Sequence, residues 1–177
     1  MEIHASGQLN LNNVKALSRF AMFKKADPKK RMVMWTVIYG LMLAVVIAQM
    51  VLLGVNSSLL FIVGVAVFVL LFEYYLYFLA PKIKYNGMGK LKDAVNTYVF
   101  ADESMQASTV TADISGESKI LYTALARCYE TSKHMFLYQT NNQVFLVDKS
   151  TLEGGTAEEL RAKLIGFLGK KYIVCKY

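Results

Sequence analysis

The sequence predicts a membrane-embedded helical hairpin joined to a small α+β domain. Two observations predict the hairpin: residues 32–55 carry no charged side chain, and residues 59–80 carry only Glu73. A third predicts the domain, because residues 82–177 contain no apolar stretch of that length and alternate short apolar segments with turn residues. An apolar helix of about 20 residues crosses a bilayer core. We therefore expect two transmembrane helices, since the buried helix of a soluble protein rarely runs this long without a charge.

Composition divides the chain into three predicted parts. Residues 1–31 are expected to form a cytoplasmic amphipathic helix with a basic flank, residues 32–81 the transmembrane hairpin, and residues 82–177 a cytoplasmic α+β domain. The connector VNSS at 55–58 is so short that the two membrane helices must be antiparallel.

The net charge of +7 is informative through its position. Basic residues bracket the two apolar runs, whereas the connector has no charge, so the positive-inside rule predicts a multi-pass cell-membrane protein with both termini in the cytoplasm. The same side chains are candidate contacts for anionic lipid, and membrane spans explain them better than nucleic-acid binding does. They are Lys24, Lys25, Lys29, Lys30, Arg31, Lys82, Lys84, Lys90 and Lys92.

Residues 8–26 have helical periodicity, with apolar side chains such as Val14, Leu17 and Phe20 on one side and basic side chains on the other. Such a helix lies either on the inner membrane surface or on the soluble domain, and the pattern does not choose between them. Pro28 is expected to end it.

The hairpin has a predictable register. With Asn56 at its apex, the numbers of facing residues sum to about 112. The first helix then presents the small-residue stripe of Gly40, Ala44 and Ala48 to Gly64 and two phenylalanines of the second helix, which would permit close packing in lipid. The same stripe is also suited to homo-oligomerisation.

This register places Glu73 opposite Tyr39, and the pair is a candidate intramembrane polar site. Glu73 is followed by several aromatic residues and lies roughly 12 Å of helix from Pro81. An acid among interfacial aromatics is explained by its nearness to the inner membrane surface, bonded to Tyr39 or reaching water. The alternative is a protonatable group in the core of an oligomer.

The domain is expected to contain five or six antiparallel strands followed by one helix. DISGES at 113–118 reads as a turn, and NN at 141–142 as a tight hairpin turn. Thr156 can cap the final helix, Glu159 completes a capping box, and Gly169 can end it.

Few residues suggest catalysis. Cys128 is expected to be packed in a strand, and Cys175 lies in the tail, where a thiol is open to reaction. Glu130, Asp148 and Lys149 follow strand patterns, where isolated charges are usually solvated. The two histidines, at positions 4 and 134, show no zinc-site spacing. We expect no catalytic site, no cofactor, no metal site and no enzymatic activity.

The C-terminal part resembles the YcxB-like family of bacterial membrane proteins. The resemblance covers about residues 85–168 and rests on YVFADESM, on ESKILYTALARCYETSKHMFLYQTNNQVFLVDKSTL and on the terminal TAEELRAKLIGFL. Where the family often has Trp or another aromatic, this chain has Tyr122. The resemblance implies a domain similar to a pleckstrin-homology (PH) domain and implies no known activity or catalytic residue.

The predicted function is that of a membrane-tethered cytoplasmic interaction or regulatory module, with lipid as one partner and a protein bound through the domain as another. The alternative is a subunit of an oligomeric channel or transporter that uses Glu73. That alternative requires an oligomer, because two helices cannot enclose a path.

Overall fold

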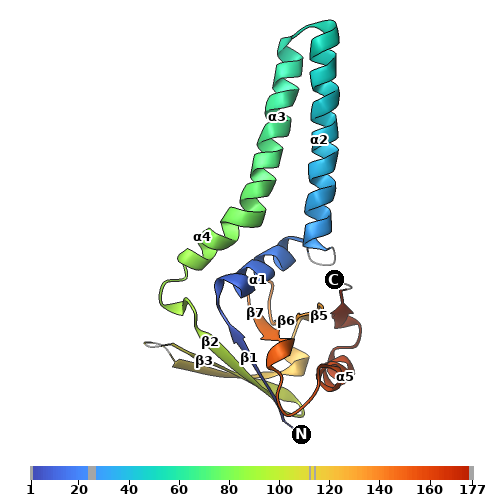
Figure 1. Cartoon of the computed structure of the whole chain (residues 1–177). Helices are drawn as coiled ribbons and strands as arrows, with labels where there is room; N and C mark the ends of the chain where they lie inside the picture. Colours follow the sequence, from blue (N-terminus) through green and yellow to red (C-terminus); the bar gives the residue numbers. More distant parts are fainter. Residues whose placement is uncertain (1, 24–26, 112, 114, 176–177) are drawn as a thin grey trace. The chain divides into compact units, whose positions relative to one another are not determined.

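A computed structural model describes residues 2–23, 27–111, 113 and 115–175. The described residues pack as two units, one formed by residues 1–18 and 84–177 and the other by residues 19–83. The first unit contains the strands and the second the helical hairpin (Figure 1). The predicted membrane contacts Lys24 and Lys25 lie outside the described residues.

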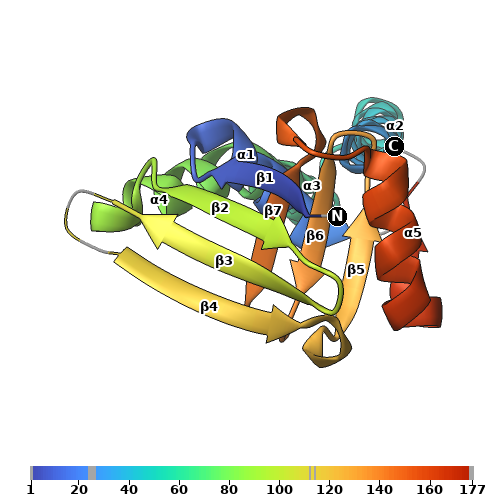
Figure 2. The same cartoon turned by 90° about the horizontal axis from the view of Figure 1, so that it is seen from below.

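The first sheet of the domain is antiparallel and starts at the beginning of the chain. Its four strands follow the order β1-β2-β3-β4 (Figure 2). Along β2, Tyr98 and Phe100 are buried while Thr97 and Val99, which alternate with them, are not, the period of two expected of a sheet with one covered face. The strands are β1 (Ile3–Gln8), β2 (Val95–Phe100), β3 (Ser104–Val110) and β4 (Ser115–Leu121).

The second sheet follows the order β7-β6-β5-β8. Its last strand pairs with β5 in parallel, whereas the other neighbours are antiparallel. The turn at Asn141–Asn142 joins β6 to β7, as predicted, and is closed by the Gln139 amide, which donates to the carbonyl of Gln143 at 3.1 Å. The strands are β5 (Arg127–Glu130), β6 (His134–Tyr138), β7 (Val144–Asp148) and β8 (Tyr172–Val174).

Strand β1 connects the two sheets. His4 and Glu153 exchange backbone hydrogen bonds of 2.9 Å, and the Ser6 amide donates to the hydroxyl of Thr151, which lies in the 3-10 turn η4 (Lys149–Thr151) after β7. At Gly7 the backbone approaches β7 so closely that a Cβ would collide with the carbonyl oxygen of Leu146. Glycine is therefore required there for steric reasons.

Both sheets contribute to one hydrophobic core. Ile3 and Phe100 of the first sheet and Leu137 and Val147 of the second are essentially inaccessible to solvent and belong to the same cluster. Helix α5 (Ala157–Leu168) adds every fourth residue to this core: Leu160, Leu164 and Leu168.

Helix α5 has the predicted ends. The Thr156 hydroxyl accepts from the Glu159 amide, and the Glu159 carboxylate accepts from the Thr156 amide, which completes the capping box. Gly169 follows as the C-cap. Phe167 is exposed, and its ring lies 5.2 Å from that of Tyr122.

The chain leaves and re-enters the first sheet at neighbouring points. Gln8 at the end of β1 pairs with Val95 at the start of β2. The next residues continue this pairing, since the Leu9 amide donates to Ala94 and the Asp93 amide donates to Leu9. The hairpin is thus an insertion between two adjacent strands, at the position of a β-turn. This segment begins with helix α1 (Leu11–Phe23).

The inserted hairpin consists of α2 (Pro28–Leu53) and α3 (Ser57–Tyr74), which run side by side in opposite directions (Figure 1). Asp27 and Asn56 cap their N-termini through side-chain oxygens. Helix α3 continues through the π-helix η1 (Tyr75–Leu79) into α4 (Ala80–Asn86), and η2 (Gly89–Leu91) follows. Both helical segments, Pro28–Leu53 and Ser57–Asn86, are long and apolar enough to cross a membrane.

The packing of α2 on α3 follows the expected register but uses different residues. Val46 and Ala66 are buried and satisfy the predicted sum of 112. The small-residue stripe was wrongly placed in this contact: Gly40, Ala44 and Gly64 are exposed, and a Cβ built on either glycine meets nothing within 4 Å. The stripe therefore lies on a different face of α2 from Val46.

Two strands and one turn differ from the predictions. Strands β1 and β8 were not anticipated, so the described residues contain eight strands instead of five or six. Residues 115–118 were read as part of a turn, yet they begin β4, where they pair with β3. The segment was read as a turn because Gly116 and the two serines near it are residue types typical of turns.

Candidate functional site

Glu73 lies in the last turn of α3 with an unsatisfied carboxylate. Its Oε2 atom is buried and has no hydrogen-bond partner in the part of the chain that the structure describes. A buried carboxylate oxygen without a donor is unfavourable by several kcal/mol. Such an atom requires an explanation, and its surroundings supply the candidates.

A cavity of about 240 Å³ surrounds this carboxylate. Its walls are largely apolar, formed among others by Met32, Trp35 and Leu76, with Arg31 and Glu73 as the charged residues. Met22 of α1 and Tyr77 of η1 complete the lining. The cavity therefore offers two opposite charges in an otherwise apolar setting. We call it the Glu73 pocket.

Arg19 of α1 lies over Tyr77, one of the residues that line this pocket. Its guanidinium carbon is 3.9 Å from the centre of the Tyr77 ring, which is the geometry of a cation–π contact. The Nε atom of Arg19 is also buried without a hydrogen-bond partner among the described residues. An unsatisfied donor and an unsatisfied acceptor thus occur in the same unit, both near Tyr77.

The π-helix η1 shapes the wall next to Glu73. The Ala80 amide donates to the carbonyl of Tyr75, five residues earlier, instead of four. One extra residue in a turn rotates the side chains that follow relative to those before. Tyr77, buried under Arg19, belongs to this turn. Such turns inside α-helices occur frequently at functional sites.

Tyr39 does not share this pocket. Its ring stacks on Trp35 at 5.7 Å, and it lines a second, apolar cavity of about 160 Å³ between α2 and α3. No hydrogen bond joins Glu73 to Tyr39 among the contacts of the described residues. Trp35 and Tyr77 are the aromatic residues that line the same cavity as Glu73.

The predicted lipid contacts occur at the ends of the inserted segment. Lys29, Lys30 and Arg31 are exposed in the first turn of α2. The others are exposed around α4 and η2: Lys82, Lys84, Lys90 and Lys92. Two of these have protein partners, because Lys90 pairs with Asp113 at 2.9 Å and Lys92 lies 4.8 Å from the Tyr85 ring centre.

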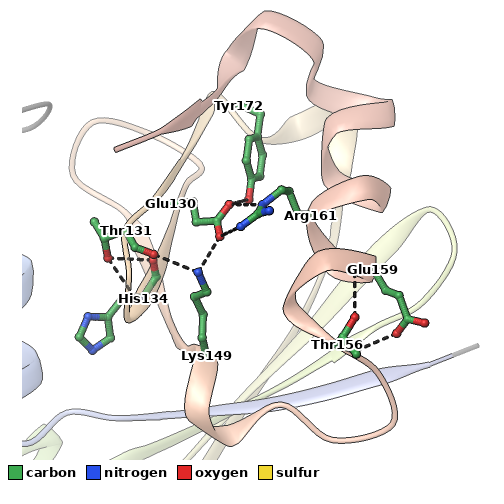
Figure 3. Close-up of polar contacts among 8 residues, drawn as sticks. All are labelled: Glu130, Thr131, His134, Lys149, Thr156, Glu159, Arg161 and Tyr172. Carbon is green, nitrogen blue, oxygen red and sulfur yellow. Dashed lines mark hydrogen bonds and ion pairs between the residues drawn. The ribbon is translucent and has the colours of Figure 1, made fainter. Parts of the chain in front are cut away.

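A second polar site, in the domain, was not predicted. Glu130 at the end of β5 is 1% exposed, although it was expected to be solvated. Lys149 and Tyr172 each donate to it at 2.6 Å, and Arg161 donates through Nε at 2.7 Å and through a terminal nitrogen at 2.6 Å (Figure 3). The carboxylate therefore joins β5, η4, α5 and β8.

These donors keep Glu130 ionised. Burial alone would raise the pKa of its carboxyl group, but the hydrogen bonds from Arg161, Lys149 and Tyr172 outweigh burial and lower the pKa to about 2. Both oxygens are occupied by donors. Such a group is a poor proton acceptor, so this network stabilises the fold rather than activating a substrate.

The two thiols are inaccessible. Cys128 and Cys175 are both buried, and burial raises the pKa of the Cys128 thiol far above its usual range. Cys175 was expected to be open to reaction, but its amide donates to the carbonyl of Glu130 at 2.7 Å and fixes it beside β5. Among the described residues, no group of three His, Cys, Asp or Glu side chains could hold a metal ion.

Comparison with known proteins finds a family model that matches part of the chain. The family model described as YcxB-like protein matches residues 102–164, from the turn before β3 to the middle of α5. This match confirms the resemblance to the YcxB-like family over those residues. No curated protein and no solved structure matches the chain.

Proposed function

We propose that this protein is a membrane-tethered, non-catalytic interaction or regulatory module with both termini in the cytoplasm. The insertion of the hairpin between β1 and β2 carries this proposal. Because Gln8 and Val95 are paired neighbours, the hairpin is attached to the domain at two adjacent points. Two attachments restrict the orientation of a domain at the membrane far more than a single flexible linker does.

The fold also supports the proposed topology. Ile3 near one end of the chain and Tyr172 near the other belong to the same core, so the described ends lie on the same side of any membrane that the hairpin crosses. The basic residues around both ends of the hairpin favour the cytoplasmic side.

A polar hollow on the first sheet is the proposed interaction surface. It has a volume of about 430 Å³ and lies over β2, β3 and β4. Glu117 and Lys119 are its charged lining residues, and Thr97, Gln106 and Ser108 add hydrogen-bonding groups. A mixed polar lining with both charges fits a protein or peptide partner better than an apolar small molecule.

Strand β4 gives this surface an open border. In the described sheet it pairs with β3 on one side and has no strand on the other. An unpaired strand edge can accept an extended peptide through its backbone groups. Peptide addition at β4 would place the partner's side chains beside the hollow.

We also propose that the domain is PH-like. Two antiparallel-rich sheets around one core, and a helix that packs on that core, support this comparison. Within this proposal, β1 is contributed from before the membrane hairpin and β2 from after it.

Photocrosslinking in native membranes tests the proposed surface. A photoreactive amino acid is placed at Gln106 or Lys119 in the hollow, and at Glu158 on the exposed side of α5 as a control. We expect one discrete crosslinked species from the hollow positions and none from the control. Glu117→Lys should reduce this product, because it removes the negative charge of the hollow. Equal crosslinking from all positions, or a product that is insensitive to Glu117→Lys, would contradict the proposal.

A further inference from the structure

Strand β4 has an unpaired edge that is exposed along almost its whole length. It forms one border of the first sheet, with β3 on one side and no described strand on the other (Figure 2). Of its seven residues only Ile120 is buried. Glu117 and Lys119 are both exposed, and neither has an ion-pair partner among the described residues. The open edge therefore carries two unpaired charges of opposite sign.

The backbone groups that face this edge belong to alternate residues. The Tyr122 amide donates to the carbonyl of Glu103 at 3.1 Å, immediately beyond the first pair of the β3–β4 ladder. Directly opposed residues of an antiparallel ladder alternate between hydrogen-bonded and non-hydrogen-bonded pairs. Residues of β4 with even numbers therefore bond to β3, and residues with odd numbers direct their amides and carbonyls to the open edge. The latter are Ser115, Glu117, Lys119 and Leu121.

The charges and the backbone favour the same pairing of β4 with a second copy of itself. In an antiparallel pair centred on Ser118, Glu117 of each copy lies directly opposite Lys119 of the other. Both positions direct their backbone groups to the edge, so each such pair also exchanges two backbone hydrogen bonds. Opposite charges at directly opposed positions stabilise antiparallel strands. The strand is thus complementary to itself in both backbone and charge.

The nearest alternative registers lack this complementarity. Those that keep the same backbone pattern are centred on Glu117 or on Lys119. Each of these residues then faces its own copy, and like charges directly opposite each other destabilise the pair. Charged residues on an edge strand commonly prevent association, but the order of the charges in β4 disfavours these registers and favours the one centred on Ser118.

Two exposed apolar side chains add to this register. Leu121 at the end of β4 is 53% exposed, and Val110 at the end of β3 is 56% exposed. Val110 lies opposite Ser115 within one copy, and Leu121 of the second copy lies on the other side of the same serine. The joined sheet therefore covers part of both apolar side chains, which favours association.

We propose that two copies of this protein dimerise through β4, joined antiparallel about Ser118 into one continuous sheet, with Glu117 of each copy paired with Lys119 of the other. This inference rests on the proposed function, in which the same edge accepts a protein partner, and it identifies that partner as a second copy of the chain. A membrane tether adds to the association, because it confines both copies to one surface and raises their effective concentration.

Disulfide crosslinking of single cysteines tests the register. Ser118→Cys places two thiols on the dimer axis, at a non-hydrogen-bonded pair whose Cα atoms lie about 4.5 Å apart, within the range of a disulfide. Ser115→Cys is the matched control in the same strand, because this register separates its two copies by about 20 Å. The native thiols of Cys128 and Cys175 are buried.

The full-length protein is oxidised in its native membranes, and the initial rate of dimer formation is read from non-reducing gels. We expect Ser118→Cys to crosslink at least about tenfold faster than Ser115→Cys, because only the first pair of thiols meets the distance requirement. Equal rates for the two variants would overturn the proposal, since collisions without a register also produce them.

A charge exchange, made in the Ser118→Cys background, tests the two ion pairs. Glu117→Lys places lysines opposite lysines, and Lys119→Glu places glutamates opposite glutamates, so each should slow crosslinking about tenfold. When the two variants are coexpressed with tags of different size, the mixed dimer regains both ion pairs and should crosslink at the original rate. Its recovery also establishes that both variants are folded.

Two controls accompany the charge exchange. Maleimide labelling of the monomer corrects for the effect of a neighbouring charge on thiol reactivity, and circular dichroism establishes the fold of each variant. Rates that do not respond to the single exchanges, or a mixed dimer of folded variants that stays slow, would exclude the pairing of Glu117 with Lys119.

The photocrosslinking described above distinguishes failure of this inference from failure of the proposed function. For a dimer, the species captured from Lys119 should have twice the mass of the chain. A captured species of another mass, together with no Ser118→Cys dimer, would overturn the inference and leave the interaction surface with a different protein partner. No product in either experiment would contradict both.

Discussion

Single side chains determine how the parts of the domain are held together, and Glu130 has the most partners. Its three donor residues are 19, 31 and 42 positions away in sequence. Each comes from a different element, so the carboxylate links β5 to η4, to α5 and to β8. The sequence placed Glu130 at a strand end but could not indicate its burial, because no local pattern connects it to Lys149, Arg161 or Tyr172.

Removing the charge of Glu130 should destabilise the domain. In Glu130→Gln the guanidinium of Arg161 and the ammonium group of Lys149 lose their shared counterion, and we expect a loss of about 3 kcal/mol in unfolding free energy. Native-state hydrogen exchange of the β5, β6 and β7 amides in the full-length protein measures it. The control is Asp102→Asn, since the Asp102 side chain is 86% exposed and lies 3.5 Å from Lys163; it should cost less than about 0.5 kcal/mol. Equal effects of the two variants would contradict this account.

The same network predicts the pH dependence of stability. The Glu130 pKa is lowered from its ordinary value of 4.5 to about 2 in the folded domain. Its contribution is therefore complete above pH 4.5 and is lost as the pH falls towards 2. The stability difference between the wild type and Glu130→Gln should shrink over this interval in hydrogen exchange or thermal unfolding. A difference that is constant between pH 6 and pH 3 would show that the charge of Glu130 is not its cause.

Gly7 is the second single residue on which the packing of the domain depends. A Cβ at Gly7 would collide with the Leu146 carbonyl, so Gly7→Ala must push β1 away from β7. We expect a loss of more than about 2 kcal/mol, measured by exchange of the β1 and β7 amides. The matched control is Gly116→Ala in β4, where a Cβ meets nothing within 4 Å. Alanine should be tolerated there, and comparable losses at both glycines would exclude the steric explanation.

At the scale of elements, local signals were reliable and non-local pairing was not. The capping box of Thr156 and Glu159 and the turn at 141–142 lie within a few residues of sequence, and the structure contains both. Strands β1 and β8 are edge strands whose partners lie far along the chain. Their pairing depends on the completed sheets, so the residues alone do not indicate it.

The hairpin illustrates the same limit. A connector of a few residues determines which positions of α2 and α3 are level with each other, and this register could be predicted. The face that each helix turns to the other depends on rotation about its axis, and spacing alone does not determine that rotation. The small-residue stripe was therefore assigned to the wrong face, whereas Val46 and Ala66 are the buried residues of α2 and α3.

The proposed topology of the hairpin predicts a labelling pattern. Native Cys128 and Cys175 are buried, so a membrane-impermeant maleimide should label the folded wild type poorly. Labelling of a variant then reports the accessibility of its introduced cysteine. Val55→Cys at the hairpin connector should be labelled in intact cells. Asn141→Cys in the exposed turn between β6 and β7 should be labelled after the membrane is permeabilised. Labelling of Asn141→Cys in intact cells would invert the topology and contradict the proposal.

At the scale of the whole molecule, the helical hairpin interrupts a domain instead of preceding it. Sequence composition divides the chain at residue 82, where apolar residues give way to mixed ones. The first sheet contains strands from both sides of that division, because β1 is paired along its whole length with β2. Composition reports the solvent that surrounds a segment and carries no information about which segments share a sheet. This is why the predicted domain began at 82 and the contribution of β1 was missed.

This architecture makes a direct prediction about the isolated domain. A chain that joins residues 2–18 through a flexible glycine–serine linker to residues 84–175 contains β1, and we expect it to be soluble and cooperatively folded. The matched control, residues 84–175 alone, lacks Ile3 and Ala5, which are buried in the core, and exposes the β2 edge together with the β7 side that Gly7 approaches. Burying a side chain such as Ile3 contributes about 1.5 to 3 kcal/mol, and the backbone pairs of β1 are lost with it. The control should therefore aggregate or melt at a much lower temperature in differential scanning calorimetry. If both chains fold with equal stability, β1 is dispensable for the fold. The hairpin would then be held firmly to the domain only through β2, which would contradict the proposed double attachment.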